Sequence, residues 1–187
     1  MAEHVILFAG PMGAGKTTAV QTLSEIAVVS TEAANTERNI VDKATTTVAL
    51  DYGEITLDLD DKVRLYGVPG QKRFDFMWTI LKERARGMVL LVNNDAPDPI
   101  ATMLDYLGEF EELVARGTVL IAISRTDAAP SPTIDDYSDA LFEARPDLFL
   151  PIFTVDPRDL GQMTTLLLTL VATIDSREQA TPEGMLS

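Results

Sequence analysis

Residues 10–17 carry the clearest chemical signal in the chain. They read Gly-Pro-Met-Gly-Ala-Gly-Lys-Thr, a pattern that places glycine, four further residues and Gly-Lys-Thr between a buried strand and a helix. Glycines let backbone N–H groups curl around an anion, and the start of a helix adds positive potential. Lys16, also a candidate catalytic group, would reach the β- and γ-phosphates of a nucleotide, and the Thr17 hydroxyl would bind Mg²⁺. We therefore predict nucleotide contacts at Gly10, Met12, Gly13, Ala14, Gly15, Lys16 and Thr17, with Thr18 as either a further contact or an ordinary helical residue.

A second segment with chemical potential, residues 65–71, reads Leu-Tyr-Gly-Val-Pro-Gly-Gln and ends a predicted strand that runs toward the phosphates. It resembles the Asp-x-x-Gly-Gln segment of Ras-like GTPases. The resemblance implies that Gly70 donates its N–H to the γ-phosphate and that Gln71, as a catalytic residue, orients the attacking water. Gly67 stands where that family carries an aspartate near Mg²⁺, and glycine cannot bind a metal ion or its water. We therefore expect Mg²⁺ to be held less firmly here.

Residues 124–127, Ser-Arg-Thr-Asp, look like a relaxed form of the Asn-Lys-x-Asp motif that reads guanine. Asp127 would accept hydrogen bonds from guanine N1 and N2, whereas adenine N1 is an acceptor and adenine has no 2-amino group. Arg125 would stack its stem on the base in place of lysine. Alone, these residues equally describe a strand leading into a loop; their order after the other two motifs favours guanine. Thr154-Val155-Asp156, with Val155 as the candidate contact, lies where Ras-like proteins have a loop whose backbone N–H meets guanine O6.

Two further resemblances concern the γ-phosphate. Thr47 is similar to the threonine of Rab-like proteins whose hydroxyl binds Mg²⁺ only in the triphosphate state, with Thr46 as the nearest alternative and ordinary strand threonines as another. Arg38 and Arg73 could each neutralise charge that develops on the γ-phosphate during hydrolysis, or could simply face solvent.

The order of these motifs over residues 5–174 resembles MglA-type bacterial small GTPases and the related proteins of actinobacterial conservon operons. That resemblance implies GTP or GDP with Mg²⁺ as ligands, Arg38 as an intrinsic arginine finger, and a roadblock/LC7-fold partner, often a GTPase activator, in polarity, motility or signalling. The resulting hypothesis is a molecular switch that hydrolyses GTP slowly. Two alternatives stay open: an adaptor that holds the nucleotide without turnover, and an ATPase or small-molecule kinase that uses the same loop.

The elements that would position these residues follow from the apolar pattern. Short apolar runs predict strands near residues 5–9, 48–59, 62–68, 88–92, 118–123 and 151–155, with a kink or bulge near Gly53. Helical spacing predicts helices over residues 16–27, 74–81, 100–114 and 160–174, whereas residues 28–46 are typical of a long loop. We therefore expect an α/β fold of the Ras-like P-loop NTPase type: a mostly parallel six-stranded sheet with one antiparallel strand and helices on both faces. Residues 1–175 would form one domain and residues 176–187 a flexible tail.

Composition narrows the classes of function. The chain has 187 residues, 46% of them apolar, no cysteine and only one histidine, His4, which excludes disulfide, thiolate and multi-histidine chemistry. The net charge of −14 disfavours binding to nucleic acid or anionic lipid. No apolar run approaches the ~20 residues of a membrane span, and neither a secretion signal nor a lipidation signal is evident. We expect a cytoplasmic protein without a stable membrane anchor.

Overall fold

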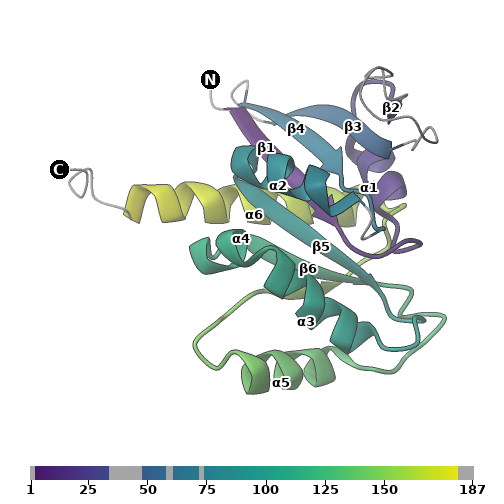
Figure 1. Cartoon of the computed structure of the whole chain (residues 1–187), viewed down its shortest axis with the longest axis vertical. Helices are drawn as coiled ribbons and strands as arrows, with labels where there is room; N and C mark the ends of the chain where they lie inside the picture. The colour runs from purple at the N-terminus through teal and green to yellow at the C-terminus, as the bar shows by residue number, and fades with distance from the viewer. Residues whose placement is uncertain (1–2, 34–47, 58–60, 72–73, 181–187) are drawn as a thin grey trace.

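The computed structural model describes residues 3–33, 48–57, 61–71 and 74–180. Within these ranges the chain forms one sheet of seven strands, with helices on both faces (Figure 1). The strands are β1 (Glu3–Ala9), β2 (Val29–Ala33), β3 (Val48–Leu57), β4 (Asp61–Gly67), β5 (Gly87–Asn93), β6 (Val119–Ser124) and β7 (Ile152–Thr154). The helices are α1 (Lys16–Leu23), α2 (Asp75–Arg84), α3 (Pro99–Glu109), α4 (Glu111–Arg116), α5 (Ile134–Ala144) and α6 (Leu160–Ala180).

The strand order in the sheet is β2-β3-β4-β1-β5-β6-β7. Strand β3 is antiparallel to both of its neighbours, and the other neighbouring pairs are parallel. The predicted α/β fold, with its mostly parallel sheet and single antiparallel strand, is therefore confirmed. The predicted number of strands is wrong, because Val29–Ala33 forms a seventh strand inside the segment expected to be a loop. This strand lies at the sheet edge and reads Val-Ser-Thr-Glu-Ala, so it lacks the apolar pattern that would predict a strand.

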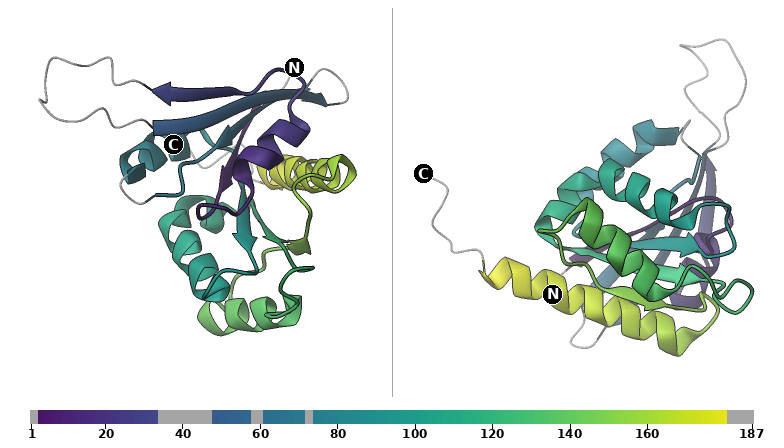
Figure 2. Two further views of the ribbon diagram at one scale, coloured as in Figure 1. Left: turned by 90° about the vertical axis from the view of Figure 1, so that its right-hand side faces the viewer. Right: turned by 90° about the horizontal axis from the view of Figure 1, so that it is seen from below.

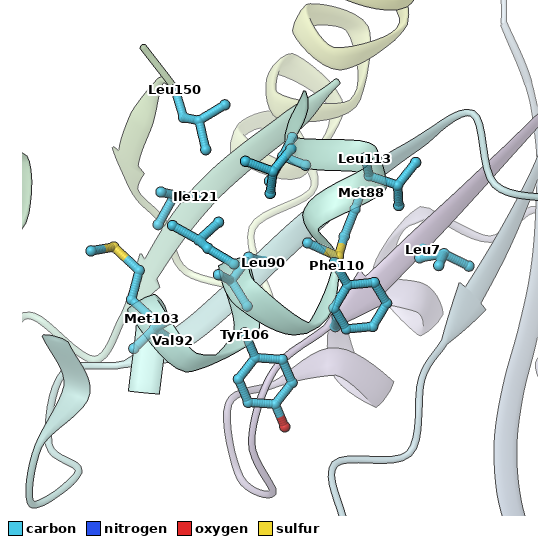
Figure 3. Packing of buried hydrophobic residues seen from close by; sticks show 14 of the residues in the cluster. Leu7, Met88, Leu90, Val92, Met103, Tyr106, Phe110, Leu113, Ile121 and Leu150 are labelled. Carbon is cyan, nitrogen blue, oxygen red and sulfur yellow. The ribbon is translucent and has the colours of Figure 1, made fainter. Parts of the chain in front are cut away.

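Each face of the sheet has its own hydrophobic core. Figure 2 shows the helices that lie on the two faces. Along β1, Ile6 and Phe8 pack beneath α1 and α6, whereas Leu7 and Ala9 face the core covered by α2–α5. Figure 3 shows Leu7 in that second core, which also holds the rings of Tyr106 and Phe110. Burial on both faces explains why β1, β5 and β6 are continuous apolar runs.

Strand β3 contains no bulge at Gly53. Its pairing with β4 continues without interruption from Asp51 opposite Gly67 to Leu57 opposite Asp61. The apolar residues change phase because Leu50 packs against one core and Ile55 against the other. Gly53 itself lies against α1, where a Cβ atom would approach the Ser24 Oγ to 2.7 Å. Strand β3 is thus regular, and its apolar residues change phase because they pack against the cores on opposite faces of the sheet.

Helix boundaries account for further differences from the prediction. Helix α1 ends at Leu23 because Ser24 turns toward β3, where its Oγ accepts a hydrogen bond from the Glu54 backbone N–H at 3.1 Å. The helix predicted over residues 100–114 is divided at Phe110 into α3 and α4. Helix α6 continues to Ala180, so residues 176–180 are helical and do not begin the expected tail. None of the helices in the described ranges combines the length and apolarity that crossing a bilayer requires.

Helix α5 was not expected from the sequence. It begins with a capping box, in which the Thr133 side chain accepts from the Asp136 N–H and the Asp136 side chain accepts from the Thr133 N–H. The helix is joined to the end of β5 through Asn94, whose Nδ2 donates to the carbonyl oxygens of Ala129 at 2.7 Å and Pro132 at 2.9 Å. This amide therefore fixes the loop that leads from β6 into α5.

The buried hydrogen bond between α5 and Asn94 gives a test of this packing. The Tyr137 hydroxyl donates to Asn94 Oδ1 at 2.6 Å, and Tyr137 is fully buried. Tyr137→Phe leaves that amide oxygen without its donor, so the free energy of unfolding should fall by about 1–3 kcal/mol in urea titrations. The control is Tyr52→Phe, because the Tyr52 hydroxyl bonds only Glu54 beside solvent; it should lose less than about 1 kcal/mol. Equal losses would contradict the prediction.

Candidate functional site

The carboxyl ends of the parallel strands meet at one edge of the sheet, where loops from several strands converge. Figure 1 shows β1 and β5 running toward this edge together. A cleft of about 720 Å³ lies there. It is lined by residues 13–15, Thr18, Asp95, residues 124–128, residues 154–158 and Gln162. Residues from the phosphate-loop motif and from the predicted base-reading motif thus share one cavity.

The phosphate loop has the form that an anion site requires. Gly15 stands at the N-cap of α1 with φ of 101°, a left-handed conformation that side chains rarely tolerate. Helix α1 has no side-chain cap and no acidic residue in its first turn. Its positive end and unpaired N–H groups are therefore available to a phosphate.

The side chain of Lys16 folds back onto the phosphate loop. Its Nζ donates to the carbonyl oxygens of Gly10 and Pro11, each at 2.7 Å. Burial lowers the pKa of Lys16 to about 8, and the charge of Asp51 partly opposes that effect. The ammonium group is consequently held among carbonyl dipoles at the place where a polyanion would bind.

The segment that follows β4 lies directly against the loop, as predicted. A Cβ atom on Gly70 would lie 2.8 Å from the Met12 backbone nitrogen and 2.9 Å from the Gly10 carbonyl oxygen, so only glycine permits this approach. The Gln71 side chain also reaches the loop, where its Nε2 donates to the Met12 sulfur at 3.1 Å. The positions expected for Gly70 and Gln71 are therefore compatible with their predicted roles, which remain predictions.

Two aromatic side chains fasten this segment to the helices. The indole N–H of Trp78 in α2 donates to the Pro69 carbonyl oxygen at 3.0 Å, and the Tyr106 hydroxyl in α3 donates to the Gly70 carbonyl oxygen at 3.3 Å. Burial raises the pKa of Tyr106 to about 12, so its hydroxyl remains a donor at neutral pH. A displacement of Gly70 would consequently strain or break these hydrogen bonds to α2 and α3.

The predicted base-reading motif, residues 124–127, forms the other wall of the cleft. Ser124 is buried, and its Oγ donates to the Ala14 carbonyl oxygen at 3.1 Å, which ties this wall to the phosphate loop. Arg125 follows with φ of 60° and pairs with Asp95 at 2.9 Å. Asp127 is exposed where it lines the cleft. No local pattern in the sequence predicts this bridging contact of Ser124, because the contact depends on the fold.

The loop after β7 differs from the expectation. The Val155 N–H already donates to the Ile123 carbonyl oxygen at 2.9 Å, so this N–H is not available for guanine O6 in this structure, and the contact of the loop with a base remains a prediction. Val155 still lines the cleft. Arg158 stands at the same wall and pairs with Asp156 at 2.8 Å, and its hydrogen bonds lower the pKa of Asp156 to about 2.

Thr17 has a partner that sequence analysis did not identify. Its Oγ1 donates to Asp51 Oδ2, while Asp51 Oδ1 accepts from the Ser30 Oγ at 2.8 Å. Asp51 is buried, although its place between Leu50 and Tyr52 in β3 puts it on the face that the apolar alternation marks as polar. Among the described residues no group of three or more His, Cys, Asp or Glu side chains could hold a metal ion.

Three predicted site residues, Arg38, Thr47 and Arg73, lie outside the described residues, as does the alternative Thr46. Their proposed roles stay predictions.

Comparison with known proteins adds one finding. A family model described as conserved hypothetical ATP binding protein matches residues 26–129, more than half of the chain. The chain belongs to this family. The match includes Gly70, Gln71 and Asp127 and begins after the phosphate loop, which the sequence pattern and the structure identify independently. No curated protein of similar sequence was found. Together these observations make the chain a nucleotide-binding protein with a P-loop fold.

The buried ammonium group of Lys16 makes nucleotide binding dependent on pH. Only the protonated amine attracts phosphate, and its pKa in the free protein is about 8. Affinity should be nearly constant below that pH and fall above it, by about tenfold between about pH 7 and about pH 9. Titration with a fluorescent nucleotide analogue at each pH measures the effect. Lys16→Ala should bind weakly without this slope, and a flat wild-type profile would refute the assignment.

Proposed function

We propose that this protein is a guanine-nucleotide-dependent molecular switch that binds GTP with Mg²⁺, hydrolyses it slowly and transmits its nucleotide state to a partner. The observation that carries the proposal is the meeting of three motifs at one edge of the sheet. The phosphate loop and the segment around Asp127 line a single cleft, and Gly70 touches the same loop from the other side. Family membership supports the nucleotide class.

The choice of guanine rests on the chemistry of Asp127. An ionised carboxylate only accepts hydrogen bonds, and guanine offers two donors, N1–H and the 2-amino group, side by side. Adenine would direct its N1 acceptor at the same carboxylate, which leaves two acceptors facing each other. The description of the family favours ATP, so an ATP-using P-loop protein is the second candidate. In that case Asp127 would have no part in reading the base.

Hydrolysis in this site would depend on positioning. The N–H groups at the start of α1 and the Lys16 ammonium bind the phosphates, and Thr17 supplies a hydroxyl ligand for Mg²⁺, which when bound neutralises phosphate charge. Gln71 leaves Met12 and orients a water molecule. The water oxygen bonds to the γ-phosphorus as the bond to the β–γ bridging oxygen breaks, and the proton passes to the released phosphate. Turnover is slow until Gln71 and an arginine, for which Arg38 is the candidate, are aligned.

The signal to a partner would pass through α2. Loss of the γ-phosphate removes the contact proposed for Gly70, whose segment is tied to α2 by Trp78 and to α3 by Tyr106. Phe74, Trp78 and Leu81 are buried and Met77 is partly buried, whereas Phe76 and Ile80 are each 56% exposed. We place the partner surface at Phe76 and Ile80, since exposed aromatic and apolar residues are enriched in interfaces. A roadblock/LC7-fold regulator is the partner that the resemblance to MglA-type proteins implies.

Base preference tests the proposal directly. Asp127→Asn exchanges an acceptor for a mixed amide, so affinity for GTP should fall by about tenfold or more relative to that for xanthosine triphosphate. Competition of GTP, ATP and xanthosine triphosphate against a fluorescent nucleotide measures the preference. Asp139→Asn on α5 is the control, because Asp139 is exposed and does not line the cleft. A wild-type protein that prefers ATP would decide for the second candidate.

Catalysis by Gln71 is tested separately. Gln71→Leu should slow multiple-turnover phosphate release at least about tenfold while nucleotide affinity changes little, because Gln71 acts on water and not on the bound phosphates. Gln21→Leu, an exposed change on α1 away from the cleft, is the control. Assays are run with and without a candidate roadblock partner. Tight binding without turnover in either condition would instead indicate a nucleotide-locked adaptor.

A further inference from the structure

Gly67 lies beside Asp51 of the neighbouring strand β3. Gly67 is the last residue of β4, and its partner across the antiparallel ladder is Asp51 in β3. A Cβ atom on Gly67 would lie 3.1 Å from Asp51 Cβ and 3.2 Å from Asp51 Oδ2. The Asp51 side chain thus occupies the space into which a side chain at residue 67 would extend. The carboxylate that appeared to be missing from the sequence is present on the neighbouring strand.

The contacts of this carboxylate point toward the phosphate site. Asp51 is 9% exposed, and one of its oxygens accepts from the hydroxyl of Thr17, the second residue of α1. The other oxygen accepts from Ser30 in β2 at 2.8 Å. Its negative charge also acts on the neighbouring Lys16 ammonium. A buried carboxylate is therefore fixed between the predicted metal ligand and the predicted phosphate ligand.

We propose that Asp51 is the carboxylate that binds Mg²⁺ at the nucleotide site, directly or through a metal-bound water, and that it replaces an acidic residue at Gly67. The inference rests on the proposed nucleotide function. Mg²⁺ sites of this kind use one or two carboxylates together with substrate phosphates, and the Thr17–Asp51 contact brings two hard oxygen ligands together. Since the described residues contain no larger acidic cluster, the metal binds tightly only with the nucleotide.

A merely structural role would leave a different signature. If Asp51 only accepted hydrogen bonds from Thr17 and Ser30, then Asp51→Asn would leave metal dependence unchanged, because its amide oxygen still accepts from one hydroxyl and its NH₂ group can donate to the other. If Asp51 binds Mg²⁺, loss of its charge weakens the metal in the nucleotide complex and leaves metal-free nucleotide binding nearly intact. The two roles therefore separate in a measurement of metal affinity, which does not require hydrolysis.

The exchange of the two residues is the sharper test. In Asp51→Gly/Gly67→Asp the carboxylate returns to β4 and the space beside it is vacated, so total volume and charge at the ladder position are conserved. Gly67→Asp alone would crowd two carboxylates within contact distance. Glu54→Gln is the matched control, because Glu54 lies on the same strand and pairs with Lys62 instead of Thr17.

The experiment measures release of a fluorescent GDP analogue over a series of Mg²⁺ concentrations and in EDTA, together with Mn²⁺ binding to the nucleotide complex by electron paramagnetic resonance. We expect Asp51→Asn to raise the half-effective Mg²⁺ concentration at least about tenfold with little change in EDTA, and the exchange variant and Glu54→Gln to stay within about threefold of wild type. Circular dichroism verifies folding.

The outcomes separate the two proposals. Failure of the wild type to bind any nucleotide overturns the proposed function. Normal nucleotide binding with the same Mg²⁺ and Mn²⁺ dependence in the wild type and Asp51→Asn overturns the assignment of Asp51 alone. Should Asp51→Asn not fold, the exchange variant decides: a dependence on Mg²⁺ like that of the wild type supports the assignment, and loss of that dependence in a folded exchange variant overturns it.

Discussion

A buried ammonium group at the start of α1 is the interaction on which the arrangement of the site depends. Removing the charge of Lys16 from water is unfavourable unless partners replace the lost solvent. Two loop carbonyl oxygens at 2.7 Å and the nearby Asp51 carboxylate supply part of that replacement. The positive end of α1 adds to the same potential, and its first turn has no acidic side chain. The loop is thus arranged before binding for a ligand that carries several negative charges.

The direction of each strand explains how the other groups reach this charge. The carboxyl ends of the parallel strands lie at the site, which places Ser124 at the end of β6, Asp127 after it and Gly70 after β4. Strand β3 runs the opposite way, so residues near its beginning lie at the same edge. The antiparallel strand therefore contributes a side chain, Asp51, from near its beginning, whereas the parallel strands β6 and β7 contribute residues at and after their carboxyl ends.

Patterns among adjacent residues predicted several strands of the sheet and the phosphate loop. Continuous apolar runs identified β1, β5 and β6, and the glycine spacing identified the phosphate loop, because each signal depends on adjacent residues. Strand β2 was missed because it is polar and is held by its pairing with β3. Helix α5 was missed although Thr133 and Asp136 form a capping box. The contacts of Asp51 and the occupied Val155 N–H depend on strand register and pairing, which no short stretch of sequence contains.

The proposed choice between guanine and adenine also depends on the position of one side chain in the fold. The description of the matched family names ATP as the ligand. The matched region nevertheless includes Asp127, whose ionised carboxylate only accepts hydrogen bonds. A purine acceptor that faces this exposed carboxylate leaves both acceptors without a donor, whereas the phosphates and ribose contribute equally for either nucleotide. Preference for one base can consequently depend on the loop that follows β6. The family match and the phosphate loop indicate a nucleotide, whereas the proposed recognition of guanine rests on the chemistry of Asp127.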